Sequence, residues 1–339
     1  MPCRIVLIGP GAIGGITAAF LAKAGDEITV VCKHQSTVDL ASGKGLHVTG
    51  VLGDFHTPVK AVKTIAELDG LFDFCLIATK AYDMPACAKA MLPHLREDSL
   101  VVSMQNGICI DTLASIVGER RTVGCVIGFG GTMLGPGEID MTSTGDLIIG
   151  QTGGNGPRIQ ELAGLLNHVQ PTHVSDDIYA DLYSKMIVNA CITSLGAICG
   201  LKLGQMMKRR DARTIFLAIV DEAVRVANAM HLKLPPYAGK LDFYRLMAGT
   251  SPLDDLRRHL TIRVVGIKYR RLKSSSLQSL ERGQLTEVDC FNGYIAEKGR
   301  ALGVPTPVCD RLVAMIHEEE AGKRKISIEN LSDPVFAAL

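Results

Sequence analysis

The feature that most constrains the fold of this chain is a glycine-rich turn near its N-terminus. Residues Gly9-Pro10-Gly11-Ala12-Ile13-Gly14 form a G-x-G-x-x-G motif, with an apolar run at 4–8 before it and helical periodicity at 13–24 after it. The first glycine of such a turn permits the sharp bend, the second lets a pyrophosphate approach the backbone, and the third lets the helix pack on the strand. The motif therefore predicts a dinucleotide site at Gly9, Gly11, Ala12, Ile13 and Gly14, with the helix N-terminus facing the phosphates.

The rest of the first half alternates strand and helix patterns. Apolar, β-branched runs predict buried strands at 28–32, 74–78, 100–103 and 122–127. Helical spacing lies between them at 82–92 and 112–117. This alternation predicts a Rossmann-type doubly wound parallel sheet and disfavours the alternative of a plain strand–turn–helix without a ligand. Glycines between 128 and 156 predict hairpins at the sheet edge, followed by a helix at about 158–168.

After about residue 175 the strand signal nearly vanishes. Helical spacing recurs at 178–198, 213–229, 253–264 and 285–302. We therefore expect an α/β protein, in which the N-terminal doubly wound parallel sheet is followed by an all-helical C-terminal domain. The expected boundaries are a dinucleotide-binding domain at 1–172, a helical substrate-binding and catalytic domain at 173–325, and a C-terminal tail at 326–339.

Charge and cysteine usage exclude several classes of protein. Lys+Arg 36 against Asp+Glu 35 leaves a formal net charge of +1, which argues against a nucleic-acid partner. The ten cysteines show no C-x-x-C spacing, and the four at 75, 125, 191 and 199 lie in apolar stretches, as free thiols of a reducing cytoplasm do. The nine histidines show no metal-ligand spacing, so no metal is expected.

The longest apolar stretch after the N-terminal strand is 186–201. Asn189, Thr193 and Ser194 interrupt it, and it is too short to span a bilayer. We expect a soluble, cytoplasmic protein without a membrane partner.

The end of the second predicted strand bears on the identity of the dinucleotide. An Asp or Glu at this place would accept a hydrogen bond from the ribose 2′-hydroxyl of NAD. Here Cys32 is followed by Lys33 and His34, and a cation suits the additional 2′-phosphate of NADP. The alternative is an exposed lysine at a strand end without a ligand. We favour NADP as the cofactor.

Two segments of the second half carry candidate catalytic groups. Lys185 and Asn189 are four residues apart in an apolar helical stretch and so lie on one helix face, where a lysine can donate a proton; the alternative is a lysine that extends to solvent. Later, Ser274-Ser275-Ser276 precedes Thr286-Glu287. Taken singly, these serines are typical of a loop, and Glu287 is typical of the first turn of a helix that opens at Thr286.

Taken together, these motifs resemble one known family. The chain resembles the ketopantoate reductases (2-dehydropantoate 2-reductases) over essentially its whole length. The similarity lies in Gly9-x-Gly11-x-x-Gly14, Ala78-Thr79-Lys80-Ala81, Gln105-Asn106-Gly107, Lys185-x-x-x-Asn189, Ser274-Ser275, and Thr286-Glu287-Val288-Asp289 with Asn292-Gly293. The resemblance implies NADPH-dependent reduction of a small 2-oxo acid, as a step toward pantothenate.

The resemblance also implies roles for individual residues. Lys185 would be the general acid, and Glu287 would orient the substrate or the lysine. Asn189 and Ser275 would hold the substrate. Asn106 would lie near both the nicotinamide and the substrate, while Lys80 would line the cofactor cleft and Lys33 would face the 2′-phosphate.

The chain departs from the family pattern at several positions. Thr193-Ser194 stands where the family commonly has Asn-Pro, and Leu272 stands where it commonly has Asn. The region at 232–273 and the C-terminal tail are longer than in compact members. These departures leave open another branched or aromatic 2-oxo acid as substrate, or an inactive protein that senses NADP. The extended helical half is compatible with a homodimer.

Overall fold

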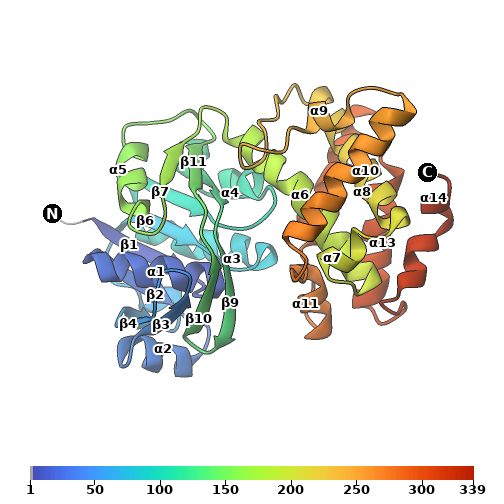
Figure 1. Ribbon diagram of the computed structural model, residues 1–339. Coiled ribbons are helices and arrows are strands. Elements are labelled where there is room, and N and C mark those ends of the chain that lie inside the picture. Colours follow the sequence, from blue (N-terminus) through green and yellow to red (C-terminus); the bar gives the residue numbers. More distant parts are fainter. Residues whose placement is uncertain (1–2) are drawn as a thin grey trace. The chain divides into compact units, whose positions relative to one another are not determined.

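The computed structural model describes residues 3–339. Its contacts divide the chain into two compact units, with the sequence boundary between Leu182 and Tyr183. The division falls inside α6 (Ile178–Cys199), whose first turn packs on the N-terminal sheet. A methyl group on Gly124 would approach the side chains of Ile178 and Leu182 to 2.7 and 2.9 Å, so the sheet and this turn are in close contact. Each unit is described by itself below (Figure 1).

The first unit is built on an eight-stranded sheet with the order β12-β11-β8-β7-β6-β1-β2-β5. Its strands are β1 (Arg4–Ile8), β2 (Glu27–Val31), β5 (Lys60–Val62), β6 (Phe72–Ile77), β7 (Leu95–Ser103), β8 (Thr122–Ile127), β11 (Leu147–Gln151) and β12 (Thr172–Val174). The strands from β5 to β8 across the sheet are all parallel, and β11 runs antiparallel to β8. Along the sequence, β2 and β5 are added on one side of β1, and β6, β7 and β8 are then added on its other side. The predicted doubly wound sheet is confirmed.

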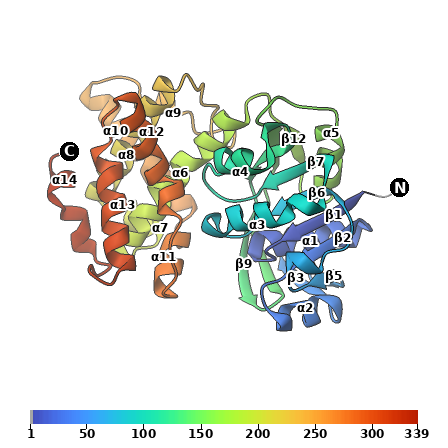
Figure 2. The same ribbon diagram turned by 180° about the vertical axis from the view of Figure 1, so that it is seen from behind.

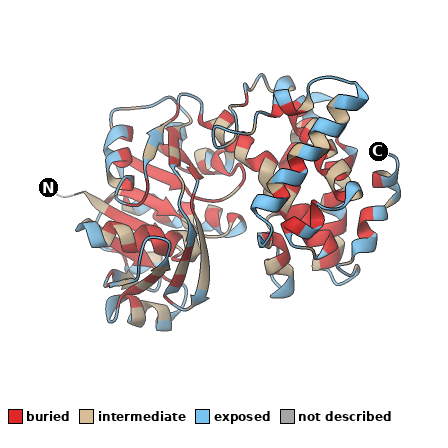
Figure 3. Ribbon diagram, in the orientation of Figure 1, coloured by how far each residue is buried: buried red, intermediate tan, exposed pale blue. Residues whose placement is uncertain are grey.

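Helices cover this sheet, and their positions follow the sequence pattern within a few residues. They are α1 (Ala12–Ala24), α2 (Gln35–Ser42), α3 (Met84–Met91), α4 (Ile110–Val117) and α5 (Ile159–Leu166), with the short 3-10 turns η1 (Ile65–Glu67), η2 (Ala81–Asp83), η3 (Leu92–His94) and η4 (Glu119–Arg121). The strands carry fully buried side chains such as Leu7, Val30 and Phe74. Figure 3 shows these buried strands at the centre of the unit. Burial on both faces explains their continuous apolar character.

A second, four-stranded sheet departs from the prediction. Its order is β4-β3-β10-β9, built from β3 (Leu46–Gly50), β4 (Phe55–Thr57), β9 (Gly130–Gly135) and β10 (Glu138–Ser143). β9 and β10 form a predicted hairpin, but they lie in this second sheet rather than at the edge of the main one, where β11 pairs instead. The physical reason is packing against α1, because a methyl group on Gly15 would lie 2.2 Å from Cδ1 of Ile139.

The second unit is helical, as the sequence predicts. After α6 it contains α7 (Leu203–Met206), α8 (Arg210–Ala229), α9 (Phe243–Met247), α10 (Pro252–Lys268), α11 (Ser275–Glu281), η5 (Val288–Cys290), α12 (Asn292–Leu302), α13 (Pro307–Glu320), η6 (Ile328–Ser332) and α14 (Pro334–Ala337). Figure 2 shows α12 and α13 side by side. The single helix predicted at 285–302 is wrong. Phe291, at φ −115° and ψ −92°, separates a 3-10 turn from α12.

The central helix of this unit is α6. At 22 residues it is longer than the apolar stretch noted in the sequence, and by length and composition it could cross a membrane. However, 78% of its most apolar window is buried inside the structure, which is typical of the core helix of a globular protein.

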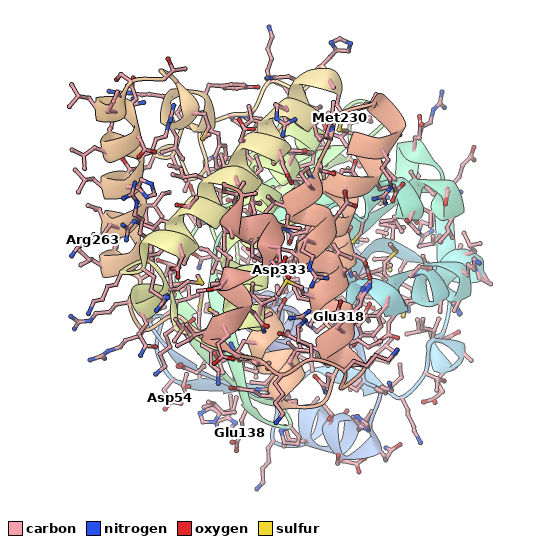
Figure 4. The ribbon with its side chains drawn as sticks, turned by 90° about the vertical axis from the view of Figure 1, so that its right-hand side faces the viewer. Asp54, Glu138, Met230, Arg263, Glu318 and Asp333 are labelled. Atoms are coloured by element: carbon pink, nitrogen blue, oxygen red, sulfur yellow. The ribbon has the colours of Figure 1, made fainter. Side chains whose placement is uncertain are left out.

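The C-terminal segment at 326–339 packs on the helical unit. The Asn330 side chain donates hydrogen bonds to the backbone oxygens of Ile198 (2.8 Å) and Lys325 (2.9 Å). Arg311 of α13 binds the Asp333 carboxylate, with Nη2 and Oδ2 2.8 Å apart. Figure 4 marks Asp333 and, on α13, Glu318. The last residues of the chain are therefore held in place by hydrogen bonds from the Asn330 side-chain amide and by the ion pair between Arg311 and Asp333.

Candidate active site

The glycine turn has the geometry that its motif predicts. Gly9 has a φ of +89°, and a methyl group on it would lie 2.9 Å from the Thr79 backbone nitrogen. A methyl group on Gly14 would lie 2.3 Å from the carbonyl oxygen of Gly9 and 2.8 Å from Cβ of Ala78. Gly11 differs, because a methyl group there would meet no atom within 4 Å. Packing therefore requires the first and third glycines, and open space adjoins the second.

Four of the predicted cofactor positions follow the carboxyl ends of neighbouring parallel strands. Gly9 follows β1, Lys33 follows β2, Lys80 follows β6 and Asn106 follows β7. β1 and β6 are hydrogen-bonded neighbours. The strand order reverses between them, because β2 and β5 lie on one side of β1 and the strands from β6 onward lie on the other. Ligands of doubly wound sheets bind beyond the carboxyl ends at such a reversal. The fold thus brings these positions to one edge of the sheet.

A glutamine that the sequence analysis gave no role organises this edge. Gln105 Oε1 accepts a hydrogen bond from the Ser103 hydroxyl at 2.6 Å. Its Nε2 donates to the backbone oxygens of Ile77 (2.8 Å) and Thr79 (3.2 Å). Gln105 therefore ties the end of β7 to the end of β6 and fixes the loop that carries half-buried Asn106. A polar residue two positions after a buried strand was the signal available in the sequence.

Thr79 carries a buried hydroxyl at this edge, next to the Cys87 thiol. Its Oγ1 is buried and makes no hydrogen bond of normal geometry. Burial raises the pKa of the nearby Cys87 thiol, Asp83 adds to this effect, and the Thr79 hydroxyl opposes it. The open space at Gly11 fits a bound diphosphate, since it would admit one close to the backbone.

Lys33 lies at the end of β2, where the ribose of a dinucleotide is held in folds of this type. It is exposed, and no acidic residue occurs between Val31 and Val38. His34, also exposed, is the N-cap residue of α2. The local charge is therefore positive, which suits a phosphate better than a 2′-hydroxyl.

In the second unit, α6 is held firmly by its neighbours. The Tyr183 hydroxyl donates to the backbone oxygen of Ala223 at 3.0 Å, and the Ser184 hydroxyl donates to that of Pro235 at 2.8 Å. Farther along, the Ser194 hydroxyl donates to Asn292 Oδ1 at the start of α12. These bonds fix both the position and the rotation of the helix.

One strip of α6 remains partly accessible in this unit. From Tyr183 to Cys199 the half-buried side chains are Lys185, Val188, Asn189 and Ile192, and the others are buried. They lie three, four and seven positions after Lys185, which is one face of a helix. The Asn189 Nδ2 is buried and has no hydrogen-bond partner. An ammonium group, an unsatisfied amide donor and two branched aliphatic side chains thus share one face.

The paired serines lie at the end of this strip. Ser274 caps α11 by accepting a hydrogen bond from the Leu277 N–H at 3.2 Å. A methyl group on Gly196, one turn beyond Ile192, would lie 2.6 Å from Ser274 Oγ. Ser275 begins α11 and is exposed. Ser274 therefore has a structural role, and Ser275 follows it as the first residue of α11.

Glu287 does not lie in the first turn of an α-helix. The interpretation made from this residue alone in the sequence is therefore wrong. It is half-buried at the N-cap position of η5, and α12 begins only at Asn292. The hydrogen bond between Asn292 and Ser194 ties this segment to α6. In the sequence, Ser194 was noted only as a departure from the family pattern. In the structure it donates a hydrogen bond to Asn292 that holds the helices together.

None of the ten cysteines, all within residues 3–339, forms a disulfide, and those at 75, 125, 191 and 199 are buried. Among residues 3–339 no three or more His, Cys, Asp or Glu side chains are grouped so that they could hold a metal ion.

Two models of one family match the chain in order. Residues 5–154 match "Ketopantoate reductase PanE/ApbA", and residues 177–320 match its C-terminal model. The 2-dehydropantoate 2-reductase of Aquifex aeolicus is 26% identical over 325 residues, covering 94% of this chain and 98% of the relative. That of Pyrococcus abyssi is 28% identical over 322 residues, with the same two coverages.

Solved structures agree with this assignment. A PanE/ApbA family ketopantoate reductase from Ralstonia eutropha JMP134 superposes with a TM-score of 0.81 at 27% identity, covering 95% of this chain and all of that one. D-mandelate dehydrogenase, solved with NADH and anilino(oxo)acetate, shares the fold with a TM-score of 0.79 at 22% identity, covering 94% and 99%.

These matches span both units, and they agree with the glycine turn and with the order of the remaining motifs. The chain belongs to the ketopantoate reductase family, oxidoreductases that act on CH–OH groups with a nicotinamide cofactor and a small oxo-acid substrate.

Proposed function

We propose that this protein reduces 2-dehydropantoate to pantoate with NADPH. The observation that carries the proposal is the accessible strip of α6, where Lys185 lies one turn from the unsatisfied amide of Asn189. The names of the relatives from Aquifex aeolicus and Pyrococcus abyssi support the same substrate.

In this proposal the strip holds the substrate and supplies a proton. When bound, NADPH supplies a hydride to the ketone carbon. Reduction leaves negative charge on the ketone oxygen, and the Lys185 ammonium group donates a proton to that oxygen. Asn189 Nδ2 donates a hydrogen bond to a substrate oxygen and so gains the partner that it lacks. Val188 and Ile192 contact the branched carbon skeleton.

The remaining predicted residues complete the proposed site. Ser275 binds the substrate carboxylate, and Glu287 orients the substrate or Lys185. Asn106, in the loop that Gln105 fixes, would lie near both the nicotinamide and the substrate.

On the cofactor side, the backbone at Gly9, Gly11, Ala12, Ile13 and Gly14 surrounds the diphosphate. Lys80 lines the cofactor cleft, and Lys33 binds the 2′-phosphate. We also propose a cytoplasmic location, which the ten free thiols support.

The test is NADPH oxidation in the presence of 2-dehydropantoate. Lys185→Ala should lower kcat about 10²–10⁴-fold, which is the usual effect of removing a positioned proton donor. Lys185→Arg keeps the charge but holds its proton too tightly to give it up, so it should be nearly as slow. Lys208→Ala changes an exposed lysine and serves as the matched control. Near-normal turnover by Lys185→Ala would refute the proposed acid.

A second candidate is the reduction of another branched or aromatic 2-oxo acid. It is motivated by Thr193, Ser194 and Leu272, which depart from the family pattern. The fold shared with D-mandelate dehydrogenase is consistent with it. Comparing kcat/KM across a panel of 2-oxo acids distinguishes the candidates, since specificity is the ratio of these values. NADPH binding without turnover of any 2-oxo acid would instead indicate a sensing protein.

A further inference from the structure

A carboxylate of α13 holds the turn that carries Glu287. Glu320 is the last residue of α13, and its Oε1 accepts a hydrogen bond from the backbone N–H of Thr286 at 2.7 Å. Thr286 directly precedes Glu287, whereas Glu320 lies 34 positions farther along the chain. The bond therefore joins the Glu287 turn, residues 286–291, to a helix to which the proposed function assigns no residue.

Both neighbours of Glu287 are buried, so the position of this turn determines where Glu287 lies. Thr286 is 7% exposed and Val288 is 1% exposed. The Val288 N–H donates to the Thr286 hydroxyl oxygen at 3.2 Å, and the Cys290 N–H donates to the Glu287 carbonyl oxygen at 2.9 Å. These bonds hold the residues of the turn together. The bond from Thr286 to Glu320 then places the whole turn on α13.

The donor in this bond is a backbone group, which links the side chain of Glu320 directly to the path of the chain. A backbone N–H of a buried residue that loses its acceptor incurs a free-energy penalty, and the chain can avoid this penalty only by moving until the N–H meets another acceptor or water. A movement of Thr286 carries Glu287 with it, because the two residues are adjacent. Loss of the acceptor should therefore displace the Glu287 carboxylate.

A second contact between the Glu287 turn and α13 is weaker. His317 Nε2 lies 3.2 Å from Oδ1 of Asp289, but these side chains are 46% and 68% exposed. Ion pairs with this degree of exposure contribute little, because water and salt screen them. A hydrogen bond between a carboxylate and a backbone N–H is stronger than a neutral one. Of the two contacts, the bond to Glu320 therefore has the larger effect on the turn.

The stability of α13 itself does not explain an acid at position 320. The C-terminal end of an α-helix carries partial negative charge, which disfavours acidic side chains there. Glu318, two positions earlier, is compensated by ion pairs with two arginines. Glu320 is compensated by the Thr286 N–H, which lies outside its own helix. This pairing indicates that Glu320 serves the Glu287 turn rather than α13.

The chain that follows the turn is linked to α6, the helix of Lys185. The Ser194 hydroxyl donates to Oδ1 of Asn292, which is fully buried at the start of α12. The stretch 286–292 is therefore held at its first residue by α13 and at its last residue by α6. Glu287 lies inside this stretch, so its position relative to Lys185 depends on both bonds.

We propose that Glu320 is a positioning residue for the reaction. By accepting the Thr286 N–H it fixes the turn that presents Glu287 to the substrate or to Lys185. This inference rests on the proposed function, which gives Glu287 its part in the reaction. Glu320 itself acts only through the backbone and contacts no reacting atom.

A double-mutant cycle in the full-length protein tests this role, with kcat/KM measured at saturating NADPH for a 2-oxo acid that the wild type reduces. Glu320→Ala removes the acceptor and should lower kcat/KM about tenfold, the effect of one lost hydrogen bond to a charged group. Glu320→Gln keeps an acceptor oxygen and should stay within about twofold of the wild type. In a Glu287→Ala background, Glu320→Ala should cause no further loss. Glu297→Ala changes an exposed glutamate of α12 and is the matched control.

Hydrogen exchange provides a second measurement, which does not require activity. The amides of residues 286–291 should exchange at least about tenfold faster in Glu320→Ala than in the wild type or in Glu320→Gln, because the turn loses its anchor. The amides of α8 should be unchanged in all three proteins.

Equal losses of kcat/KM from Glu320→Ala with and without Glu287 would overturn the inference. Unchanged exchange of residues 286–291, or faster exchange throughout the helical unit, would also overturn it. A wild type that reduces no 2-oxo acid would refute the proposed function instead, and hydrogen exchange would still show whether Glu320 holds the turn.

Discussion

The carbonyl oxygen of Gly9 occupies the place that a side chain on Gly14 would need, since a methyl group there would lie 2.3 Å from that oxygen. The obstacle is backbone on one side and Cβ of Ala78 on the other, and neither can rotate away. Gly14→Ala should therefore lower the free energy of unfolding by at least about 2 kcal/mol, within the usual range for overpacking. Urea denaturation of the protein without cofactor measures this loss.

Gly11→Ala is the matched comparison, and it should affect binding rather than folding. A methyl group at Gly11 meets no protein atom within 4 Å, and its φ of −71° and ψ of −161° suit alanine. We expect a loss of stability of no more than about 1 kcal/mol, because glycine is a somewhat better N-cap than alanine. The Kd for NADPH should rise at least about tenfold, which is 1.4 kcal/mol, because the methyl group occupies the space proposed for the diphosphate. Unchanged binding in a nucleotide titration would contradict that placement.

Lys33 should determine the choice between the two nicotinamide cofactors. Lys33→Glu replaces an attraction for the 2′-phosphate by a repulsion. The Kd for NADPH should rise by about tenfold or more, while that for NADH, which lacks this phosphate, should change little. Lys44→Glu alters another exposed lysine of the same unit and controls for net charge. Equal changes for both cofactors would remove Lys33 from the proposed phosphate site.

The parts of the fold that the sequence predicted are those set by local rules. The turn from β1 to α1 is determined by glycines at positions where a Cβ would clash. The parallel strands are determined by uninterrupted apolar runs. The second sheet was missed because the pairing that joins its two hairpins is non-local. β3 is short and joins β10, so that Val48 pairs with Ile139 far along the chain. Nothing within either segment identifies the partner strand.

The same division between local patterns, which the sequence reveals, and non-local contacts, which it does not, applies to the candidate site. Lys185 and Asn189 could be placed on one face because helical spacing alone determines it. The bond between Ser194 and Asn292 joins residues 98 positions apart, and the bonds of Gln105 depend on the neighbouring strand. Spacing within one segment cannot reveal such contacts. The sequence therefore predicted the reactive groups better than the residues that hold them in position.

Asn189 should be more important for activity than for stability. Its buried Nδ2 has no hydrogen-bond partner, so Asn189→Leu removes an unsatisfied donor rather than a bond. The free energy of unfolding should fall by no more than about 1 kcal/mol, or rise slightly. If the amide binds the substrate, kcat/KM for the 2-oxo acid should fall about 10–100-fold, the worth of one hydrogen bond to a charged group. A variant that is strongly destabilised yet fully active would show that the amide serves the fold.

Glu319 near the end of α13 is buried in an unfavourable environment for a charge. Burial raises the pKa of its carboxyl to about 8; Arg324 opposes the rise, and Glu318 and Glu320 add to it. Its Oε2 has no hydrogen-bond partner, while Oε1 accepts a bond from Asn330 Nδ2 at 3.3 Å. The folded protein thus keeps a proton on Glu319 that the unfolded chain releases near pH 4.5.

Stability should therefore fall as the pH rises from about 4.5 to 8, and this contribution should be constant at higher pH. Glu319→Gln keeps the shape and the bond to Asn330 but cannot ionise. The variant should match the wild type near pH 5, and at pH 9 it should be more stable by at least about 1.4 kcal/mol, the equivalent of one pKa unit. Urea denaturation of both proteins at pH 5, 7 and 9 measures the difference. Parallel pH profiles for the two proteins would mean that Glu319 ionises in the folded state as it does in the unfolded chain.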